Sequence, residues 1–138
     1  MDFNKLKILE GKYWDIFLHQ DQTSIGRLYF WYKKECNDLL DIPEEAIIEF
    51  YNNAKKIKYA LIKLFKPNMF NYLSLSNNTR HLHIHIIPRY SKEIKLFNII
   101  FKDNSFGESY KRNKDFIVSD EILIKIKEMI LKETKSES

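Results

Sequence analysis

Three of the four histidines in this 138-residue chain occupy alternate positions of one short stretch, as His81, His83 and His85. Side chains two residues apart share one face of a β-strand, whereas in an α-helix this spacing would scatter the three rings around the axis. Pro88 would also end such a helix. The spacing therefore predicts a strand over 80–88, with the imidazoles on one face and apolar side chains on the other.

A strand face made of imidazoles is open to three interpretations. The rings could lie on a solvated sheet surface with no further role. They could bind a metal, since neutral imidazole is a common ligand of zinc and copper, but the first acidic residue after the motif is Glu93 and no cysteine lies near. One ring could instead act as nucleophile in phosphoryl or nucleotidyl transfer while its neighbours donate protons and bind anions. We favour this third interpretation, because three imidazoles in register are unusual without a chemical role.

The stretch 81–87 resembles the motif of the histidine triad (HIT) superfamily, His-φ-His-φ-His-φ-φ with φ apolar. Flanking segments also resemble short bacterial-type HIT proteins, in particular diadenosine polyphosphate hydrolases. They are Gln-Thr-Ser-Ile-Gly-Arg at 22–27, Asn-Tyr-Leu-Ser-Leu-Ser-Asn at 71–77 and Pro-Arg-Tyr at 88–90. The resemblance covers roughly residues 13–130 and implies a HIT-like fold.

The composition indicates one globular domain over residues 1–138, with 44% hydrophobic and 30% charged residues. The single Cys36 excludes an internal disulfide and a cysteine-clustered zinc site. No apolar run approaches the roughly 20 residues of a membrane span, and no signal-peptide pattern opens the chain. We therefore expect a cytoplasmic protein without a membrane partner.

The net charge of +4 suits an anionic substrate. Lysines and acidic residues are dispersed along the chain, whereas a nucleic-acid-binding protein more often clusters its basic residues. We therefore expect an anionic small molecule and no specific nucleic acid as partner, and the resemblance implies that the small molecule is a nucleotide.

Local patterns predict an α+β fold with a roughly five-stranded antiparallel sheet. Strands are expected over 13–19, 25–33, 69–75, 80–88 and 96–101. The turn chemistry of 20–24 joins the first two strands as a hairpin, and Gly26 marks a bulge or a close approach. Residues 1–12 are predicted to form a short helix or an arm.

A long helix is expected over 43–66, where Pro43 suits the first turn and Pro67 ends the pattern. Apolar residues recur there with helical period and are predicted to face the sheet: Ile47, Phe50, Tyr51, Ala54, Ile57, Leu61, Leu64 and Phe65. A polar loop over 102–114 precedes a C-terminal helix that Ser119 caps, and 134–138 are predicted to be a frayed tail.

The resemblance implies an enzyme, a HIT-type nucleotide phosphohydrolase or nucleotidyltransferase. His83 would attack the α-phosphorus of a nucleotide derivative, and water would hydrolyse the nucleotidyl-histidine intermediate. His85 would bind a non-bridging oxygen, while His81 would support orientation and charge. A dinucleoside polyphosphate is the favoured substrate, and nucleoside phosphoramidates and sugar-nucleotides are the other family options.

The resemblance adds substrate-binding residues outside the triad: Asn71, Asn77, Asn78, His19 and Arg89. The three asparagines would complete a cradle for phosphate oxygens, and His19 would lie near the ribose. For Arg89, a contact with phosphate and an ion pair with an acidic residue are both open. Many relatives carry glycine where this chain has Ser76, so the backbone geometry of that turn is also open.

No metal or other cofactor is expected on the protein, although the substrate could carry Mg²⁺. HIT proteins commonly pair two such sheets across a dimer, so the resemblance also implies a homodimer. The alternative functions are a nucleotide-binding protein without turnover and a metal-binding histidine cluster.

Overall fold

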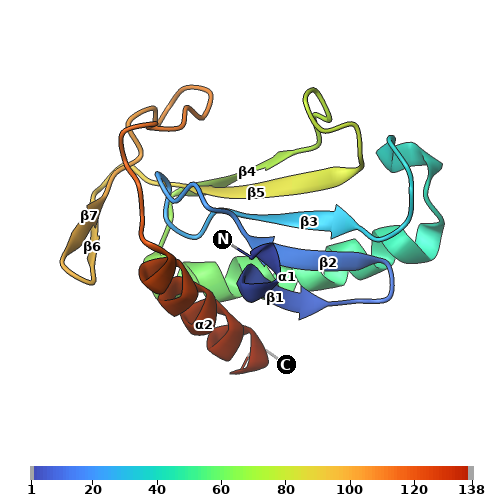
Figure 1. Ribbon diagram of the computed structural model, residues 1–138, viewed down its shortest axis with the longest axis horizontal. Helices are drawn as coiled ribbons and strands as arrows, with labels where there is room; N and C mark the ends of the chain where they lie inside the picture. Colours follow the sequence, from blue (N-terminus) through green and yellow to red (C-terminus); the bar gives the residue numbers. More distant parts are fainter. Residues whose placement is uncertain (1, 137–138) are drawn as a thin grey trace.

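The computed structural model describes residues 2–136 and contains a five-stranded antiparallel sheet (Figure 1). Its strands are β1 (Lys7–Glu10), β2 (Trp14–Leu18), β3 (Leu28–Tyr32), β4 (Met69–Leu73) and β5 (His83–Arg89). Their order across the sheet is β1-β2-β3-β5-β4. The strand that carries His83 and His85 therefore has a neighbour on each side, and β1 and β4 are the edges.

Two helices and a separate hairpin complete the α+β fold. Helix α2 (Asp120–Ser136) packs against α1 (Glu44–Phe65), β1 and the 3-10 helix η1 (Phe3–Leu6). A second 3-10 helix, η2 (Leu39–Asp41), precedes α1, while β6 (Ile94–Leu96) and β7 (Ile99–Phe101) form a two-stranded sheet of their own. In Figure 1 helix α1 runs behind β1 and β2, helix α2 lies at the lower left, and the loops around 76–80 and 102–113 rise above the strands. Within residues 2–136, neither helix is long and apolar enough to cross a membrane.

The hydrophobic core lies between α1 and one face of the sheet. Alternate strand residues are buried there, namely Trp14, Ile16, Leu18, Leu28, Phe30, Ile84 and Ile86. Across this interface, Trp14 donates its ring N–H to the carbonyl of Ala46 at 2.9 Å, and the rings of Phe30 and Phe50 meet edge to face. Because strand side chains alternate, this packing fixes His83 and His85 on the opposite face.

Gly26 confirms the expected close approach between sheet and helix. Its φ of +93° lies in the left-handed region that favours glycine. A Cβ at this position would lie 2.8 Å from a methyl of Leu61 and 3.3 Å from the ring of Pro88. The absence of a side chain therefore allows the β2–β3 connection to lie directly on α1.

Two expectations about strands are wrong. The short helix expected within 1–12 is present as η1, but residues 7–10 form β1, where the sequence suggested no strand. Residues 96–101 do not join the main sheet, because Phe97 and Asn98 have φ values of 55° and 60° and turn the chain back as the β6–β7 hairpin. The number of strands in the main sheet is as predicted, but the fifth strand comes from the N-terminus.

The helices also differ from expectation in part. Ile47 and Tyr51 are 37% and 59% exposed, so the apolar stripe of α1 is narrower than predicted. Residues 134–136 belong to α2, not to a frayed tail, and Thr134 is buried. Glu133 pairs with Lys63 of α1 at 3.2 Å, which holds this last turn against its neighbour. Residues 137 and 138 lie outside the described part of the chain.

One carboxylate ties α1 to the turn between β1 and β2. Glu49 accepts the backbone N–H groups of Lys12, Tyr13 and Trp14 at 2.8, 3.0 and 2.9 Å. A Cβ at Gly11 would lie 2.5 Å from the same carboxylate, so the turn has no room for a larger residue. This clamp fixes the position of the edge strand relative to the helix.

We predict that Glu49→Ala lowers the free energy of unfolding by about 2–3 kcal/mol, since three amides lose their acceptor and two of them are partly buried. Urea unfolding monitored by circular dichroism measures the change. Glu128→Ala is the matched control, because within residues 2–136 this exposed glutamate pairs only with its neighbour Lys127, and we expect it to change stability by less than about 0.5 kcal/mol. Equal effects of the two substitutions would contradict the clamp.

Candidate active site

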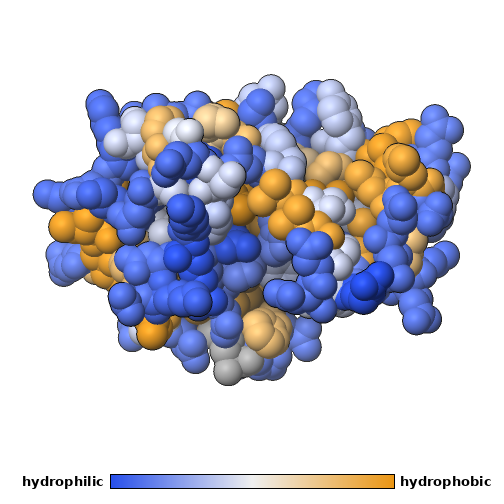
Figure 2. Space-filling model, turned by 90° about the horizontal axis from the view of Figure 1, so that it is seen from above, coloured by the Kyte–Doolittle hydropathy of each residue, from blue (hydrophilic) through white to orange (hydrophobic). Residues whose placement is uncertain are grey.

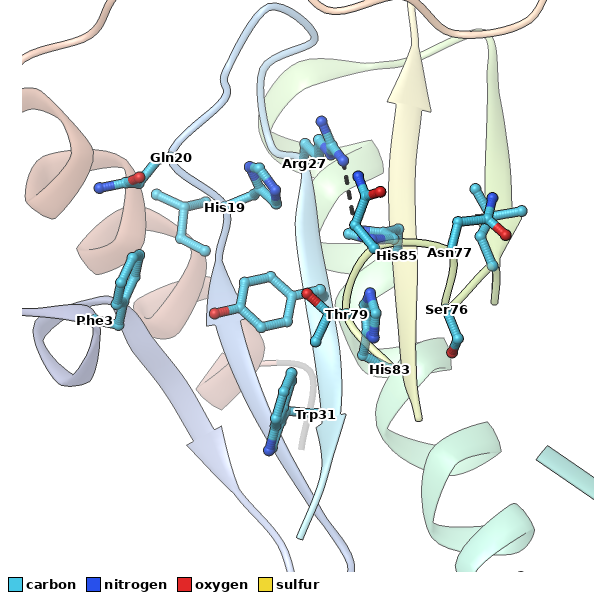
Figure 3. A pocket seen from close by; sticks show the side chains of 14 residues that line it. Phe3, His19, Gln20, Arg27, Trp31, Ser76, Asn77, Thr79, His83 and His85 are labelled. Carbon is cyan, nitrogen blue, oxygen red and sulfur yellow. Dashed lines mark hydrogen bonds between the residues drawn. The ribbon is translucent and has the colours of Figure 1, made fainter. Parts of the chain in front are cut away.

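An open cavity of about 510 Å³ lies on the sheet face opposite α1. The strand side chains that line it are Tyr29, Trp31, His83 and His85. The end of β2, the turn 75–79 and Phe3 complete the walls (Figure 3). Figure 2 shows the molecule from above, where apolar groups gather in patches on a mainly hydrophilic surface.

The pairing of β3 with β5 places an aromatic side chain beside each histidine of the cavity. Tyr29 is opposite His85 and Trp31 is opposite His83 in the antiparallel register. Paired residues project to the same face, and the ring centroids lie 6.2 and 5.8 Å apart, respectively. The sheet thus provides a flat aromatic surface next to the imidazoles.

His83 is held by a single hydrogen bond that determines its tautomer. Its Nδ1 lies 2.7 Å from the backbone carbonyl of His81. A carbonyl oxygen can only accept, so neutral His83 carries its proton on Nδ1 and a lone pair on Nε2. Among the described residues, Nε2 has no hydrogen-bond partner. An imidazole in this state can act as a nucleophile.

His81 lies in a bend before β5, so the expected row of three rings on one strand is wrong for this residue. Its carbonyl accepts from the His83 ring, and its own Nε2 donates to the carbonyl of Tyr32 at 2.6 Å. The ring stacks on Trp31 with centroids 4.1 Å apart and does not line the cavity. His81 thus contacts the site through its backbone and through Trp31.

His85 lines the cavity as a neutral ring. Its Nδ1 lies 3.5 Å from Nη2 of Arg27, which can only donate, so the proton of His85 is on Nε2. Burial, then the positive charge of Arg27 and the nearby His83, lower the pKa of His85 to about 4. This leaves an N–H donor on the ring at neutral pH.

His19 reaches the same cavity from the end of β2. Its Nδ1 accepts the backbone N–H of Asp21 at 2.9 Å, and its ring centroid lies 5.7 Å from that of His85. Burial lowers the pKa of His19 to about 3, with smaller contributions from Arg27, His85 and Arg112, while the Asp21 carboxylate opposes the shift. A second neutral imidazole with its proton on Nε2 therefore lies beside the triad.

The turn between β4 and β5 brings Asn77 and Asn78 to the cavity, together with Ser76 and Thr79. Ser76 has a φ of 51°, the left-handed conformation that glycine adopts most readily. The serine therefore keeps a glycine-like backbone, and its hydroxyl lies 3.4 Å from the His81 carbonyl. The replacement of glycine by Ser76 therefore leaves the backbone of this turn in the conformation that glycine favours.

The structure does not bring Asn71 or Arg89 to the cavity. The buried Arg89 pairs with Asp103 at 2.6 Å and donates to the side-chain oxygen of Asn71 at 2.8 Å. It also donates to the backbone carbonyls of Ser105 and Glu108. Of the two interpretations of Arg89, the structure shows the ion pair, and the residue anchors the 102–113 loop.

The sequence did not identify Arg27, Tyr29, Trp31 or Phe3 as site residues, although all four line the cavity. Tyr29 and Trp31 alternate within an aromatic strand, a signal that becomes informative only when the β3–β5 register is known. Arg27 belongs to a segment that resembles HIT proteins, yet its type alone indicates no specific role. For Phe3 the sequence contains no signal.

The family model described as the HIT domain matches residues 3–92. The chain belongs to the HIT domain family. A search among curated proteins gives no match.

Solved structures share the fold at low sequence identity. A histidine triad protein from Marinobacter aquaeolei is 16% identical with a TM-score of 0.75, covering 100% of this chain and 98% of that chain. A hypothetical histidine triad nucleotide-binding protein from Sulfolobus tokodaii is 18% identical with a TM-score of 0.69, covering 95% and 84%. A Zn-bound histidine triad family protein from Mycobacterium smegmatis is 17% identical with a TM-score of 0.65, covering 96% and 88%. These likenesses establish the fold.

In this HIT domain the histidines are not arranged as a metal centre. Over residues 2–136, no group of three or more His, Cys, Asp or Glu side chains could hold a metal ion. One reason is that His81 and His83 each direct one ring nitrogen to a backbone carbonyl.

We predict that the HIT domain loses stability as the pH falls from 7 to 5. His19 and His85 have pKa values lowered to about 3 and 4, so below about pH 6.5 the unfolded chain takes up protons that the folded chain excludes. Their contribution to stability is complete above that pH and is lost progressively below it. His19→Asn, which retains an acceptor for the Asp21 amide, should flatten this dependence in thermal melts recorded between pH 7 and 5. An unchanged slope would show that His19 is not held neutral.

Proposed function

We propose that this HIT domain cleaves a nucleotide derivative at its α-phosphorus, with dinucleoside polyphosphates as the favoured substrates. The observation that supports this most directly is the His83 tautomer, with Nδ1 held by the His81 carbonyl and Nε2 unbonded. A nucleophilic imidazole requires one nitrogen fixed as a donor and the other free. The chain's membership of the HIT family supports a nucleotide as substrate. So does its structural similarity to the histidine triad nucleotide-binding protein from Sulfolobus tokodaii.

In the proposed reaction, Nε2 of His83 forms a bond to the α-phosphorus while the bond to the leaving phosphate breaks. The leaving group departs with the electron pair of that bond. Water then attacks the same phosphorus while the bond between phosphorus and Nε2 breaks, and the electron pair of that bond returns to Nε2. The water gives up one proton to solvent or to the leaving group, and neutral His83 is restored. The hydrolysis thus proceeds in two substitutions at the same phosphorus, first by His83 and then by water. No metal on the protein takes part.

The surroundings of His83 suit an anionic substrate with an aromatic base. The N–H groups of His85 and His19 would donate to non-bridging oxygens, as preorganised donors do in other enzymes. Asn77 and Asn78 would contribute further donors from the turn. The aromatic side chains of Tyr29 and Trp31 offer a surface on which a nucleobase could stack.

We also propose a homodimer formed at the β4 edge. This strand has a free edge in the sheet order, and Met69 and Tyr72 on it are 47% and 49% exposed. Apolar side chains of α1 are exposed as well, including Ile48 and Tyr59. Pairing two β4 strands would satisfy the free backbone groups and cover apolar surface at once.

We expect a mass of about two chains in light scattering coupled to size-exclusion chromatography. A Tyr72→Lys substitution should shift the protein to a monomer, because a lysine would place like charges against each other across the symmetric interface. Lys95→Glu, on the separate β6–β7 hairpin, is the control and should leave the mass unchanged. A monomeric parent protein would refute the proposed dimer.

The function is tested by incubation with diadenosine tetraphosphate and with adenosine phosphoramidate, followed by chromatography of the products. We predict that His83→Ala lowers kcat by several powers of ten. This corresponds to an activation barrier raised by more than about 4 kcal/mol. Folding should be retained, because Leu82 and Ile84 support the core on the opposite face. His81→Ala should reduce kcat less, since His81 contacts the nucleophile through its backbone carbonyl.

Mass spectrometry after a quench that avoids acid should detect a nucleotide adduct on His83. If His83→Ala retains near-full hydrolysis, or if His85 or His81 alone is indispensable, the proposed roles within the triad are wrong. Nucleotide binding without turnover of either compound would indicate a binding protein. A stoichiometric transition metal in elemental analysis would instead favour the metal-binding alternative.

A further inference from the structure

Arg27 lies on the face of the sheet that carries His83 and His85, and the reaction proposed above gives it no role. It lies between Gly26 and the first residue of β3 and lines the cavity. One terminal nitrogen, Nη1, lies 2.6 Å from the carboxylate of Asp21, and the other, Nη2, lies 3.5 Å from Nδ1 of His85. The side chain is 13% exposed, and its Nε is buried without a partner.

Asp21 and Tyr110 hold the guanidinium of Arg27 in this position. Asp21 is buried, and it also accepts the hydroxyl of Thr23 at 2.6 Å. The phenol of Tyr110 donates to the same carboxylate at 2.6 Å, while its ring centroid lies 5.1 Å from the Arg27 guanidinium. Tyr110 lies beyond residues 3–92, the part that the family model matches. A segment outside the matched domain thus completes the environment of a cavity residue.

The contact between Arg27 and His85 restricts what His85 can present to a substrate. A guanidinium only donates, so Nδ1 of His85 must accept and its proton must be on Nε2. Without this donor, neutral imidazole could place its proton on either nitrogen. In the alternative tautomer, Nε2 would direct a lone pair toward the anionic substrate and repel it.

We propose that Arg27 is a positioning residue, which fixes His85 as the tautomer that donates from Nε2 to the substrate's phosphate. The catalytic part of this inference depends on the proposed nucleotide chemistry, whereas the effect on the His85 ring does not. The charged and titratable groups that face His85 are Arg27 itself, His83, His19 and, from the neighbouring strand, Tyr29. Of these, Arg27 alone carries a permanent charge.

Nitrogen-15 NMR of the imidazoles in the substrate-free protein tests the effect on His85 directly. In the parent protein, neutral His85 should show only the Nε2–H tautomer between pH 6 and 8. In Arg27→Met, which keeps the side-chain length but removes charge and donors, the Nδ1–H tautomer should become detectable. The pKa of His85 should rise from about 4 toward its ordinary value without reaching it, because burial remains the larger cause of the shift.

Arg80→Met is the matched control, since Arg80 is exposed and no described hydrogen bond joins its side chain to a histidine. It should leave the tautomer and pKa of His85 unchanged. Arg27→Lys is the second variant in case Arg27→Met does not fold, because it retains a positive charge for Asp21. A single ammonium cannot reproduce the two-sided contact of the guanidinium, so the Nδ1–H tautomer should again appear.

Kinetics then separate this proposal from the proposed function. If diadenosine tetraphosphate is hydrolysed, Arg27→Met should lower kcat about tenfold to a hundredfold with a smaller change in KM. This is less than the roughly 10²–10³ lost when an oriented donor is removed outright, because the His85 ring remains in place. If the tautomer changes but neither protein hydrolyses diadenosine tetraphosphate or adenosine phosphoramidate, Arg27 positions His85 and the proposed function is wrong. If folded Arg27→Met or Arg27→Lys keeps the parent tautomer and pKa of His85, the positioning role is refuted.

Discussion

The antiparallel register of β3 against β5 is the constraint on which the site depends. It pairs Phe30 with Ile84 toward the core and Trp31 with His83 toward the cavity. A slip of one residue would exchange the two faces, burying imidazoles in the core and exposing Phe30 and Ile84 to water. Because the core packing strongly disfavours such a slip, the same apolar contacts that stabilise the sheet also determine where the chemistry is located.

The sequence predicted this central part of the fold well, because period-two alternation survives in both strands. It predicted the long helix nearly to the residue, since proline and acidic residues mark one end and a second proline follows the other. It failed for β1, a four-residue edge strand with little alternation, and for residues 96–101, where two left-handed residues turn the chain. Short elements of this kind depend on tertiary pairing more than on local pattern.

Within the site, the sequence identified residues whose chemical type suggests a role. It missed residues whose role depends on where the fold places them. His83, His85, His19, Asn77 and Asn78 meet at one cavity, as expected. Arg89 and Arg27 have the same side chain, and only the structure separates them: Arg89 anchors a loop to Asp103, whereas Arg27 faces His85. His81 was misplaced as well: it lies in a bend before β5, where its carbonyl accepts from the His83 ring and its own ring donates to the carbonyl of Tyr32, contacts that the sequence pattern does not indicate.

The buried guanidinium of Arg89 has a consequence for how the 102–113 segment can move. It joins Asp103, Ser105 and Glu108 of this segment to Asn71 of β4 through bonds that share one charged group. Partial release would leave that charge buried with too few acceptors, so intermediate openings are strongly disfavoured. The segment should therefore detach as one cooperative unit, and the amide protons of its anchored residues should exchange with solvent at a common rate.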